Sequence, residues 1–290
     1  MNKTILVLML LTVILGPASP AQTPAPLRSL IDTELAFAGF TAEHGIHDGF
    51  LAFMAEGSVV FRPGPIDARG VYSAVKPSPR LLVWYPSFAW ISAAGDLGYT
   101  TGPWESFKAR GEKTPGASGH FITLWKRQAD GSFKFALDAG VSHAAHAAKA
   151  PVYAPPEQPV NTLPIPANAA VRAEAELASL EAQLAEAAAA KGYPAGIGPF
   201  LGSDARVYRA GEYPAVGLEK ALDLARKYDA RWIQKPARLT AASSGDLGFV
   251  YGLMERVPDG ARAAFLRIWR RAADGRWRLA LDLVDPFPES

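Results

Sequence analysis

The sequence predicts an α+β fold that is built twice in one chain, and three observations support this. Segments of the first half recur in the second half in the same order. Each half opens with helical periodicity. Each half continues with short segments rich in aromatic and β-branched residues, separated by Gly, Pro or Asp-Gly. Because helices that precede a set of strands pack on one face of the sheet, we expect N-terminal helices on a curved antiparallel sheet in each half.

The internal repeat is the strongest of the three observations. Residues 119–141, GHFITLWKRQADGSFKFALDAGV, align without gaps with residues 263–285, AAFLRIWRRAADGRWRLALDLVD, at an offset of 144. Residues 53–64 align with residues 200–211 at an offset of 147. Insertions and deletions in loops produce such small differences in offset. The halves are therefore predicted to be copies of one fold.

The tetrapeptide Gly-Asp-Leu-Gly occurs at residues 95–98 and again at residues 245–248. In both places it follows one short strand-like segment and precedes another. Asp and Gly tolerate turn conformations, and the tetrapeptide lacks the spacing of a phosphate-binding loop. It predicts a β-turn in each copy, and its recurrence indicates duplication of the fold.

Each copy is expected to begin with a long helix. In the first copy the helix lies in LRSLIDTELAFAGFTAEHG and ends near Gly45, and in the second it lies in AVRAEAELASLEAQLAEAAAAKGYP and ends near Gly192. Glycine ends helices because it adopts a left-handed backbone easily. A shorter helix, HDGFLAFMAE, follows in the first copy, and its counterpart near residues 196–202 is expected to be eroded by glycine.

Composition excludes several classes of protein. The chain has 290 residues, 30 Lys plus Arg against 28 Asp plus Glu, a formal net charge of +2 and no cysteine. A nucleic-acid partner is not expected, because phosphate binding needs a concentrated basic surface. Disulfides and a lipid-modified cysteine are excluded, so stability has to come from core packing.

Residues 1–21 have the composition of a secretory signal peptide. One lysine precedes an apolar run, and Gly16 and Pro17 precede small residues that end at Ala21. The run is shorter than the roughly 18 apolar residues that cross a bilayer. We expect cleavage near Ala21, a secreted and periplasmic protein, and no stable membrane anchor. The alternative is a retained membrane helix, which the length of the run disfavours.

The predicted domain organisation follows from the repeat and from one change in composition. The first domain is expected at residues 27–141 and the second, a degenerate copy, at residues 172–286. Between them, residues 142–171 are dominated by Ala and Pro and cannot form a core. Such a segment runs as an extended, semi-rigid linker.

Four segments of the first copy resemble the NTF2-like superfamily, and within it the SnoaL-like and DUF4440 group of small cone-shaped domains. They are AFAGFTAEHG, FLAFMAEGSVVFRPG, GDLGYTTGPWE and GHFITLWKRQADGSFKFALDAG. The resemblance covers residues 27–141 and, more weakly, residues 172–286. It implies a pocket between the sheet and the helices of each domain. The superfamily holds ketosteroid isomerase-like enzymes, cyclases, dehydratases and non-catalytic modules on one scaffold, so fold alone does not define activity.

Two residues are candidates for proton transfer in the first copy. His120 opens a predicted strand, and the second copy contains no histidine. An imidazole suits acid–base chemistry near neutral pH. Asp138 recurs as Asp282, and the resemblance implies a general base of this type. The alternative is structural, with these Asp residues paired to Arg62 and Arg209.

Other side chains are expected to line a pocket in the first domain or to belong to its core. Alternation along a strand places Tyr99, Thr101 and Glu105 on one side. No metal site is predicted, because Gly45 interrupts the helix that would hold His44 and His47 on one face. No cofactor is predicted either. The candidate ligand-binding residues are Trp84, Trp90, Tyr99, Thr101, Glu105, Phe121 and Trp125.

Three functions remain open from the sequence. The first is a secreted small-molecule-binding protein with a pocket in domain 1 for an apolar or aromatic ligand. The second is an isomerase, dehydratase or cyclase-type enzyme, which needs His120 and Asp138 to converge in one cavity. The third is a non-catalytic association module. The two domains are expected to pair through their sheets as a pseudo-dimer, with a homodimer as the alternative.

Overall fold

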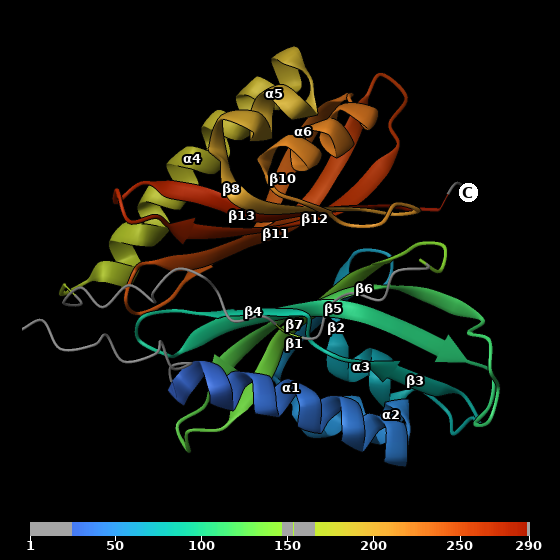
Figure 1. The fold of residues 1–290 in the computed structure, drawn as a ribbon. Coiled ribbons are helices and arrows are strands. Elements are labelled where there is room, and N and C mark those ends of the chain that lie inside the picture. The colour runs from blue at the N-terminus through green and yellow to red at the C-terminus, as the bar shows by residue number, and fades with distance from the viewer. Residues whose placement is uncertain (1–24, 147–152, 154–165, 289–290) are drawn as a thin grey trace, which may run out of the picture.

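Two β-sheets face one another, and each carries its helices on the outer side (Figure 1). The computed structural model describes residues 25–146, 153 and 166–288. We call residues 25–146 the N-terminal unit and residues 166–288 the C-terminal unit. The predicted signal peptide and most of the predicted linker lie outside the described residues. Within the described part of the chain, no helix is both long enough and apolar enough to cross a membrane.

The N-terminal unit has the predicted order of helices before strands. Its sheet has the order β2-β1-β7-β6-β5-β3, and β4 also pairs with β5. Gly45, with φ at +93°, ends the first helix where the sequence predicts. The elements are α1 (Ala25–His44), α2 (Ile46–Phe53), β1 (Met54–Phe61), β2 (Pro65–Asp67), α3 (Ala68–Ser73), β3 (Leu81–Trp84), β4 (Phe88–Ile91), β5 (Leu97–Phe107), β6 (Ala117–Arg127) and β7 (Phe133–Ser142).

The C-terminal unit repeats this plan with small changes. Its sheet has the order β10-β11-β12-β13-β8-β9, and the long strand β10 stands where the N-terminal unit has β3 and β4. The eroded helix survives as the short α5 and a 3₁₀ turn, η1. The elements are α4 (Ala169–Lys191), α5 (Tyr193–Ile197), η1 (Gly198–Phe200), β8 (Leu201–Arg209), β9 (Ala215–Val216), α6 (Leu218–Lys227), β10 (Arg231–Ala241), β11 (Leu247–Val257), β12 (Arg262–Arg271) and β13 (Trp277–Pro286).

The expectation of purely antiparallel sheets is wrong. Strand β1 runs parallel to β7, and β8 runs parallel to β13. A parallel pair needs a long crossover connection. In each unit the connection consists of all the elements that lie in the sequence between the first long strand and the last. It is long enough for these two strands to lie side by side in the same direction. The sheets are therefore mixed.

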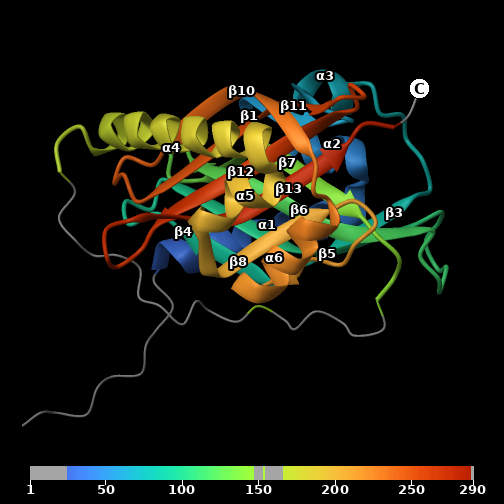
Figure 2. The ribbon, with the colours of Figure 1, turned by 90° about the horizontal axis from the view of Figure 1, so that it is seen from above.

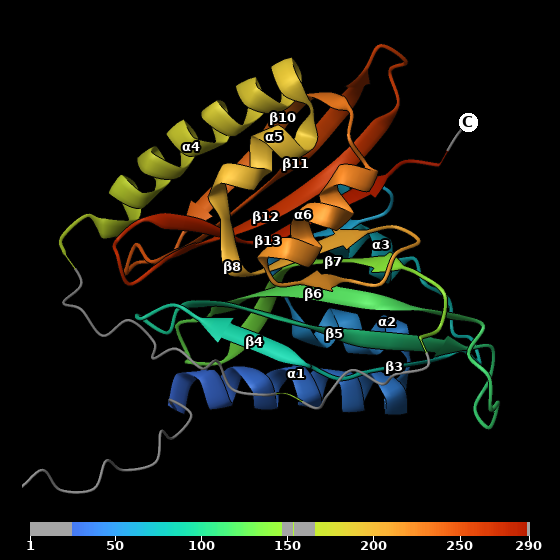
Figure 3. The same ribbon diagram turned by 45° about the horizontal axis from the view of Figure 1, so that its top comes forward.

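The inner faces of the two sheets bury side chains against each other, and Figures 2 and 3 show the stacked sheets from above and obliquely. One apolar cluster draws on both units, including Tyr99 and Ile122 from the first and Phe249 and Leu266 from the second. The outer face of each sheet packs on the helices of its own unit. Both faces of both sheets are thus covered.

The two Gly-Asp-Leu-Gly turns touch each other across this interface. Asp246 Oδ2 accepts a hydrogen bond from the backbone nitrogen of Ala93 at 3.0 Å. Asp96 Oδ2 accepts one from the backbone nitrogen of Ser243 at 2.9 Å. The first glycine of each motif has nearly the same left-handed φ, 69° and 68°. Such reciprocal contacts are the mark of a two-fold interface, so the units pair with pseudo-two-fold symmetry.

Candidate functional site

A cavity of about 270 Å³ lies in the N-terminal unit, between its sheet and its helices. Its walls are largely apolar and aromatic, and its polar groups include Arg62, Thr123 and Asp138. An apolar cavity with a few polar groups is the usual form of a small-molecule site. The apolar walls include Phe37, Phe50, Leu82, Trp84, Trp104 and Phe121.

The alternation of β6 decides which side chains reach this cavity. Phe121 and Thr123 line the cavity on the helix side of the sheet. Ile122 and Leu124 belong to the cluster between the two sheets. Successive residues of a strand point to opposite faces. His120 therefore shares the face of Ile122 and points toward the C-terminal unit.

Asp138 of β7 provides the carboxyl group of the cavity. Thr123 Oγ1 donates a hydrogen bond to Asp138 Oδ1 at 2.9 Å. Burial raises the pKa of Asp138 from 3.8 to about 6, and the nearby charge of Arg62 opposes this shift. A carboxyl group with such a pKa changes its charge within the range of ordinary cellular pH. It can therefore bind or release a proton together with a ligand.

A second carboxyl group, Glu34 of α1, lies fully buried beside the cavity wall. Trp84 Nε1 donates to Glu34 Oε1 at 2.6 Å, and Trp125 Nε1 donates to Glu34 Oε2 at 3.0 Å. Burial raises the pKa of Glu34 to about 7, although these hydrogen bonds act in the opposite direction. Glu34 thereby fixes the indole of Trp84, which is part of the wall.

Sequence reasoning did not identify Glu34 as a site residue. The signal is present, because Glu34 lies on the apolar face of its helix between Ile31 and Phe37. It also recurs at Glu181, at the offset of 147 that relates the earlier matched segments. A carboxylate that is kept on a buried face in both copies indicates an interior role.

In the C-terminal unit the same region is filled by charged side chains. Arg267 stands at the position of Thr123 and is fully buried. Its Nη1 lies 2.5 Å from Glu181 Oε2, and its Nε lies 3.3 Å from Asp282 Oδ1. Arg209 Nη2 lies 2.6 Å from Asp282 Oδ2. The carboxylates that match Glu34 and Asp138 are thus neutralised by the protein's own arginines.

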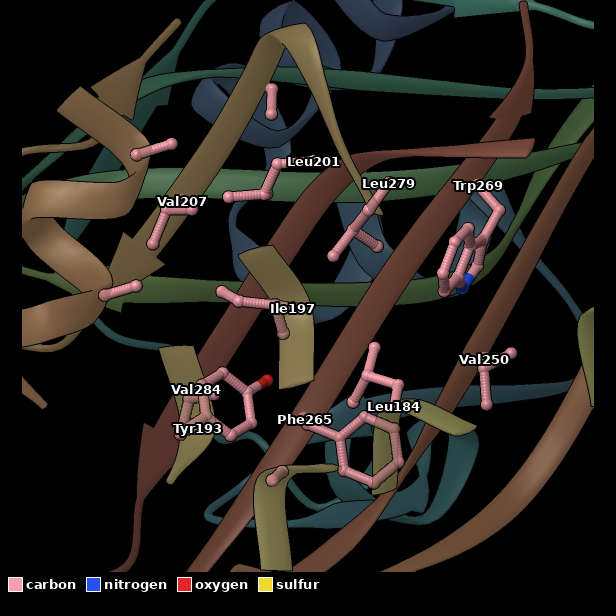
Figure 4. Packing of buried hydrophobic residues seen from close by; sticks show 14 of the residues in the cluster. Leu184, Tyr193, Ile197, Leu201, Val207, Val250, Phe265, Trp269, Leu279 and Val284 are labelled. Carbon is pink, nitrogen blue, oxygen red and sulfur yellow. The ribbon is translucent and has the colours of Figure 1, made fainter. Parts of the chain in front are cut away.

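Aromatic side chains complete the filled interior of the C-terminal unit. The hydroxyl of Tyr193 donates to Asp282 Oδ1 at 2.7 Å. Trp269 Nε1 donates to Glu181 Oε1 at 2.7 Å, as Trp125 does to Glu34. Figure 4 shows Tyr193, Phe265 and Trp269 within the apolar packing of this unit.

Three of the residues predicted to bind a ligand or to act in catalysis lie together in the cavity of the N-terminal unit. Trp84, Phe121 and Asp138 all line it. Trp125 lies on the same side of the sheet but is completely buried, with its indole nitrogen bonded to Glu34 and to Thr100. Trp125 therefore helps to fix Glu34, which in turn binds Trp84 of the cavity wall.

The remaining predicted residues lie elsewhere. Tyr99 is buried between the sheets. Thr101 Oγ1 lies there too, 2.8 Å from the hydroxyl of Tyr208 in the C-terminal unit. The ring of Trp90 packs against the guanidinium of Arg270, 4.1 Å from the ring centroid. These three side chains hold the two units together.

Glu105 lines a second, smaller cavity of about 170 Å³, together with His120 and His143. His120 Nδ1 lies 2.8 Å from His143 Nε2, and burial lowers the pKa of His120 to about 3. Asp138 lines the other cavity, across the sheet. His120 and Asp138 do not converge, as an enzyme that used both would need, because neighbouring strands present these two side chains on opposite faces.

Metal binding has no candidate among the residues that the structure describes, since no group of three or more His, Cys, Asp or Glu side chains is suitably placed there. His47 Nδ1 instead lies 2.7 Å from Asp48 Oδ1 at the surface. This arrangement is an exposed pair at the start of α2.

No family model matches the sequence, and no curated protein matches it. Among solved structures, the chain is similar to an NTF2-like protein of unknown function from Pseudomonas putida, with 17% identity over 41% of this chain and 91% of that chain and a TM-score of 0.35. A ketosteroid isomerase-like protein from Erwinia carotovora atroseptica has 16% identity over 40% of this chain and 97% of its own, with a TM-score of 0.32.

A third similar structure is that of a protein from Catenulispora acidiphila in complex with S-DNPA. It has 18% identity over 40% of this chain and 94% of its own length, with a TM-score of 0.33.

Proposed function

We propose that the N-terminal unit is an NTF2-like domain of the SnoaL-like and DUF4440 group that binds a small molecule in its helix-side cavity, and that the C-terminal unit is a tandem, degenerate copy. One observation carries the proposal. At the position where Arg267 fills the C-terminal unit, Thr123 leaves space in the N-terminal unit, and the half-buried carboxyl group of Asp138 lines that space.

The chemistry of the cavity indicates the kind of ligand. The walls formed by Phe37, Trp84 and Phe121 suit an apolar or aromatic body. Asp138 accepts a hydrogen bond when ionised, and Arg62 offers a positive charge in the same cavity. A ligand with a fused-ring body and one hydroxyl or amine group fits both features.

Plugging the cavity tests this proposal directly. Thr123→Arg introduces the residue that the C-terminal unit already carries, and Thr123→Ser is the matched control that keeps the hydroxyl. With 2-naphthol as the probe, followed by its fluorescence, we expect at least about tenfold weaker binding for Thr123→Arg and little change for Thr123→Ser. Equal binding by wild type and Thr123→Arg in a folded protein would overturn the proposal.

The raised pKa of Asp138 favours a second function, an isomerase, dehydratase or cyclase-type enzyme with a single carboxyl base. In such a reaction the Asp138 carboxylate takes a proton from the carbon next to a carbonyl group and returns it after rearrangement. Arg62 faces the negative charge that forms on the carbonyl oxygen.

Deuterium exchange distinguishes catalysis from binding alone. With 2-tetralone in D₂O, followed by NMR, we expect a catalyst to speed the exchange of the protons beside the carbonyl. Asp138→Asn should abolish that acceleration while binding of the ketone persists. Exchange at the buffer rate with wild type would leave the binding function and reject the enzyme.

Secretion to the periplasm is also proposed, and the composition of residues 1–21 supports it. Mass spectrometry of the full-length gene product, recovered by osmotic shock, tests this. We expect a mature chain that begins at or near Gln22. A protein that keeps residues 1–21 and remains with the membrane fraction would contradict the proposal.

A further inference from the structure

The second cavity lies where the two units meet and is formed by both. β3, β5 and β6 of the N-terminal unit contribute Trp84, Trp104 and His120, and the C-terminal unit contributes Tyr213. The loop that carries Tyr213 is tied to β7, because Gly211 donates a backbone hydrogen bond to Ser142 O at 2.8 Å. This wall is therefore held in place before any ligand arrives.

The cavity is lined mainly by rings. The centroid of the Tyr213 ring lies 4.9 Å from that of His120 and 5.3 Å from that of His143, both edge-on. Trp84 and Trp104 lie at the boundary with the helix-side cavity, since they line both. A volume of about 170 Å³ suits one aromatic ring or a small fused pair, given that an apolar cavity of about 150 Å³ holds benzene.

The hydrogen bonds of the histidines define which atom can recognise a ligand. His143 Nδ1 lies 2.8 Å from the carbonyl oxygen of Ala144, which can only accept, so this nitrogen carries a proton. In the neutral ring His143 Nε2 is then an acceptor. With His143 in that neutral form, His120 Nδ1, 2.8 Å away, is the donor of the pair.

The consequence is an unprotonated nitrogen at the other end of the His120 ring. Burial keeps His120 neutral near pH 7, since its pKa is lowered to about 3. With Nδ1 carrying the proton, His120 Nε2 is a hydrogen-bond acceptor. The hydrogen bond between the two histidines engages Nδ1 of His120, so Nε2 is the ring nitrogen that remains for a ligand in this cavity. A ligand that offers an O–H or N–H group can satisfy it.

The pseudo-symmetric position in the molecule is packed instead. Ala264 stands at the position of His120, and Phe287 stands at the position of His143. The ring of Phe287 closely approaches Gly64 and lies 5.1 Å from the guanidinium of Arg262. Thus one end of the interface is filled by Phe287, while the other carries polar rings around a space.

We propose that this inter-unit cavity is a second binding site, for a small aromatic molecule of the phenol or indole class that donates a hydrogen bond to His120 Nε2 and lies against Tyr213 and Trp104. The site is separate from the helix-side cavity and does not depend on the function proposed for it. The shared wall of Trp84 and Trp104 makes the two sites neighbours.

Calorimetric titration of the full chain with phenol and with toluene tests the proposal. His120→Phe keeps a ring of similar size and removes the acceptor. We expect this variant to bind phenol about tenfold more weakly, as loss of a buried hydrogen bond requires, with toluene binding unchanged. His47→Phe, at an exposed histidine, is the matched control and should leave both affinities as they are.

Two further variants test whether phenol binds in the inter-unit cavity or in the helix-side cavity. Tyr213→Ala removes the wall contributed by the C-terminal unit and should weaken both probes, even if His120→Phe proves unstable. Thr123→Arg plugs the helix-side cavity and should leave phenol binding intact. Phenol binding that disappears in Thr123→Arg but persists in His120→Phe and Tyr213→Ala would overturn the proposal.

Discussion

The interiors of the two units share their carboxylates and differ in the groups that surround them. Glu34 and Glu181 occupy matching places on the first helices, and each accepts a hydrogen bond from a tryptophan. In the C-terminal unit Glu181 is paired with Arg267, which replaces Thr123. Within the described residues, Glu34 forms no ion pair. Arg267 and Tyr193 thus fill, in the C-terminal unit, an interior that is partly hollow in the N-terminal unit.

This difference shows what the carboxylates do in each unit. A buried carboxylate that is paired with a guanidinium is a structural element, because both charges are satisfied. A carboxyl group without an ion pair, such as Glu34 bonded to Trp84 and Trp125, keeps the capacity to gain or lose a proton. Burial thus raises the pKa of the interior carboxyl groups of the N-terminal unit, whereas the matching carboxylates of the C-terminal unit are paired with arginines.

The largest expected effect comes from breaking the ion network of the C-terminal unit. Arg267→Thr gives this unit the residue of its partner and leaves Glu181 buried without a cation. Removing one member of a buried ion pair costs about 3–5 kcal/mol. Urea unfolding should show this loss, whereas the exposed control Arg276→Thr should change stability by less than about 0.5 kcal/mol. A loss for Arg267→Thr below about 1 kcal/mol would contradict a structural role for the network.

The second effect is a pH dependence that originates in the N-terminal unit. The pKa of Glu34 is about 7 in the folded protein and 4.5 without the fold. The folded state therefore binds more protons between these values, and stability falls as pH rises from 4.5 to 7. The difference corresponds to about 3 kcal/mol.

Unfolding by urea at several pH values measures this slope. Glu34→Gln should make the slope shallower, because the amide does not titrate, and the remaining slope comes from Asp138 and Asp285, whose pKa values burial raises to about 6. Glu186→Gln, at an exposed position of α4, should leave the slope unchanged. An unchanged slope in Glu34→Gln would show that other groups cause the pH dependence.

The smallest effect concerns the place where the units remain alike. Asp96→Ala and Asp246→Ala each remove one side of the reciprocal contact between the Gly-Asp-Leu-Gly turns. Each should lower the free energy of unfolding by about 1.5–3 kcal/mol, the usual range for a hydrogen bond to a charged group. The corresponding Asn variants keep an acceptor oxygen and should lose less. Losses for the two Ala variants that differ by more than about 1 kcal/mol would argue against an equivalent role.

Local sequence signals predicted the elements well. The ends of α1 at Gly45 and of α4 near Gly192, and the strands after each Gly-Asp-Leu-Gly turn, follow from periodicity and turn chemistry. The parallel pairing of β1 with β7 could not be predicted in this way, since strand direction depends on contacts far apart in the sequence. The periodicity of apolar residues indicates which residues share one face of a helix or strand. It does not indicate which other element packs on that face.

The candidate site was predicted only in part for the same reason. Alternation places Phe121 and His120 on opposite faces of β6, but both faces of the sheet are buried there, so the pattern did not show which one holds the cavity. Asp138 was found because it recurs in both copies. Thr123 was missed because its importance appears only beside Arg267, and that comparison needs the interior contacts of both units.

The reciprocal turns have a consequence for how this molecule could diverge. In a dimer of identical chains every amino-acid change appears twice, so an arginine that closes one pocket closes both. Here the two partners of the pseudo-dimer are encoded separately within a single polypeptide. The joint made by Asp96 and Asp246 can stay symmetric while the interiors on either side of it change independently. A substitution that fills one interior therefore leaves the other one open.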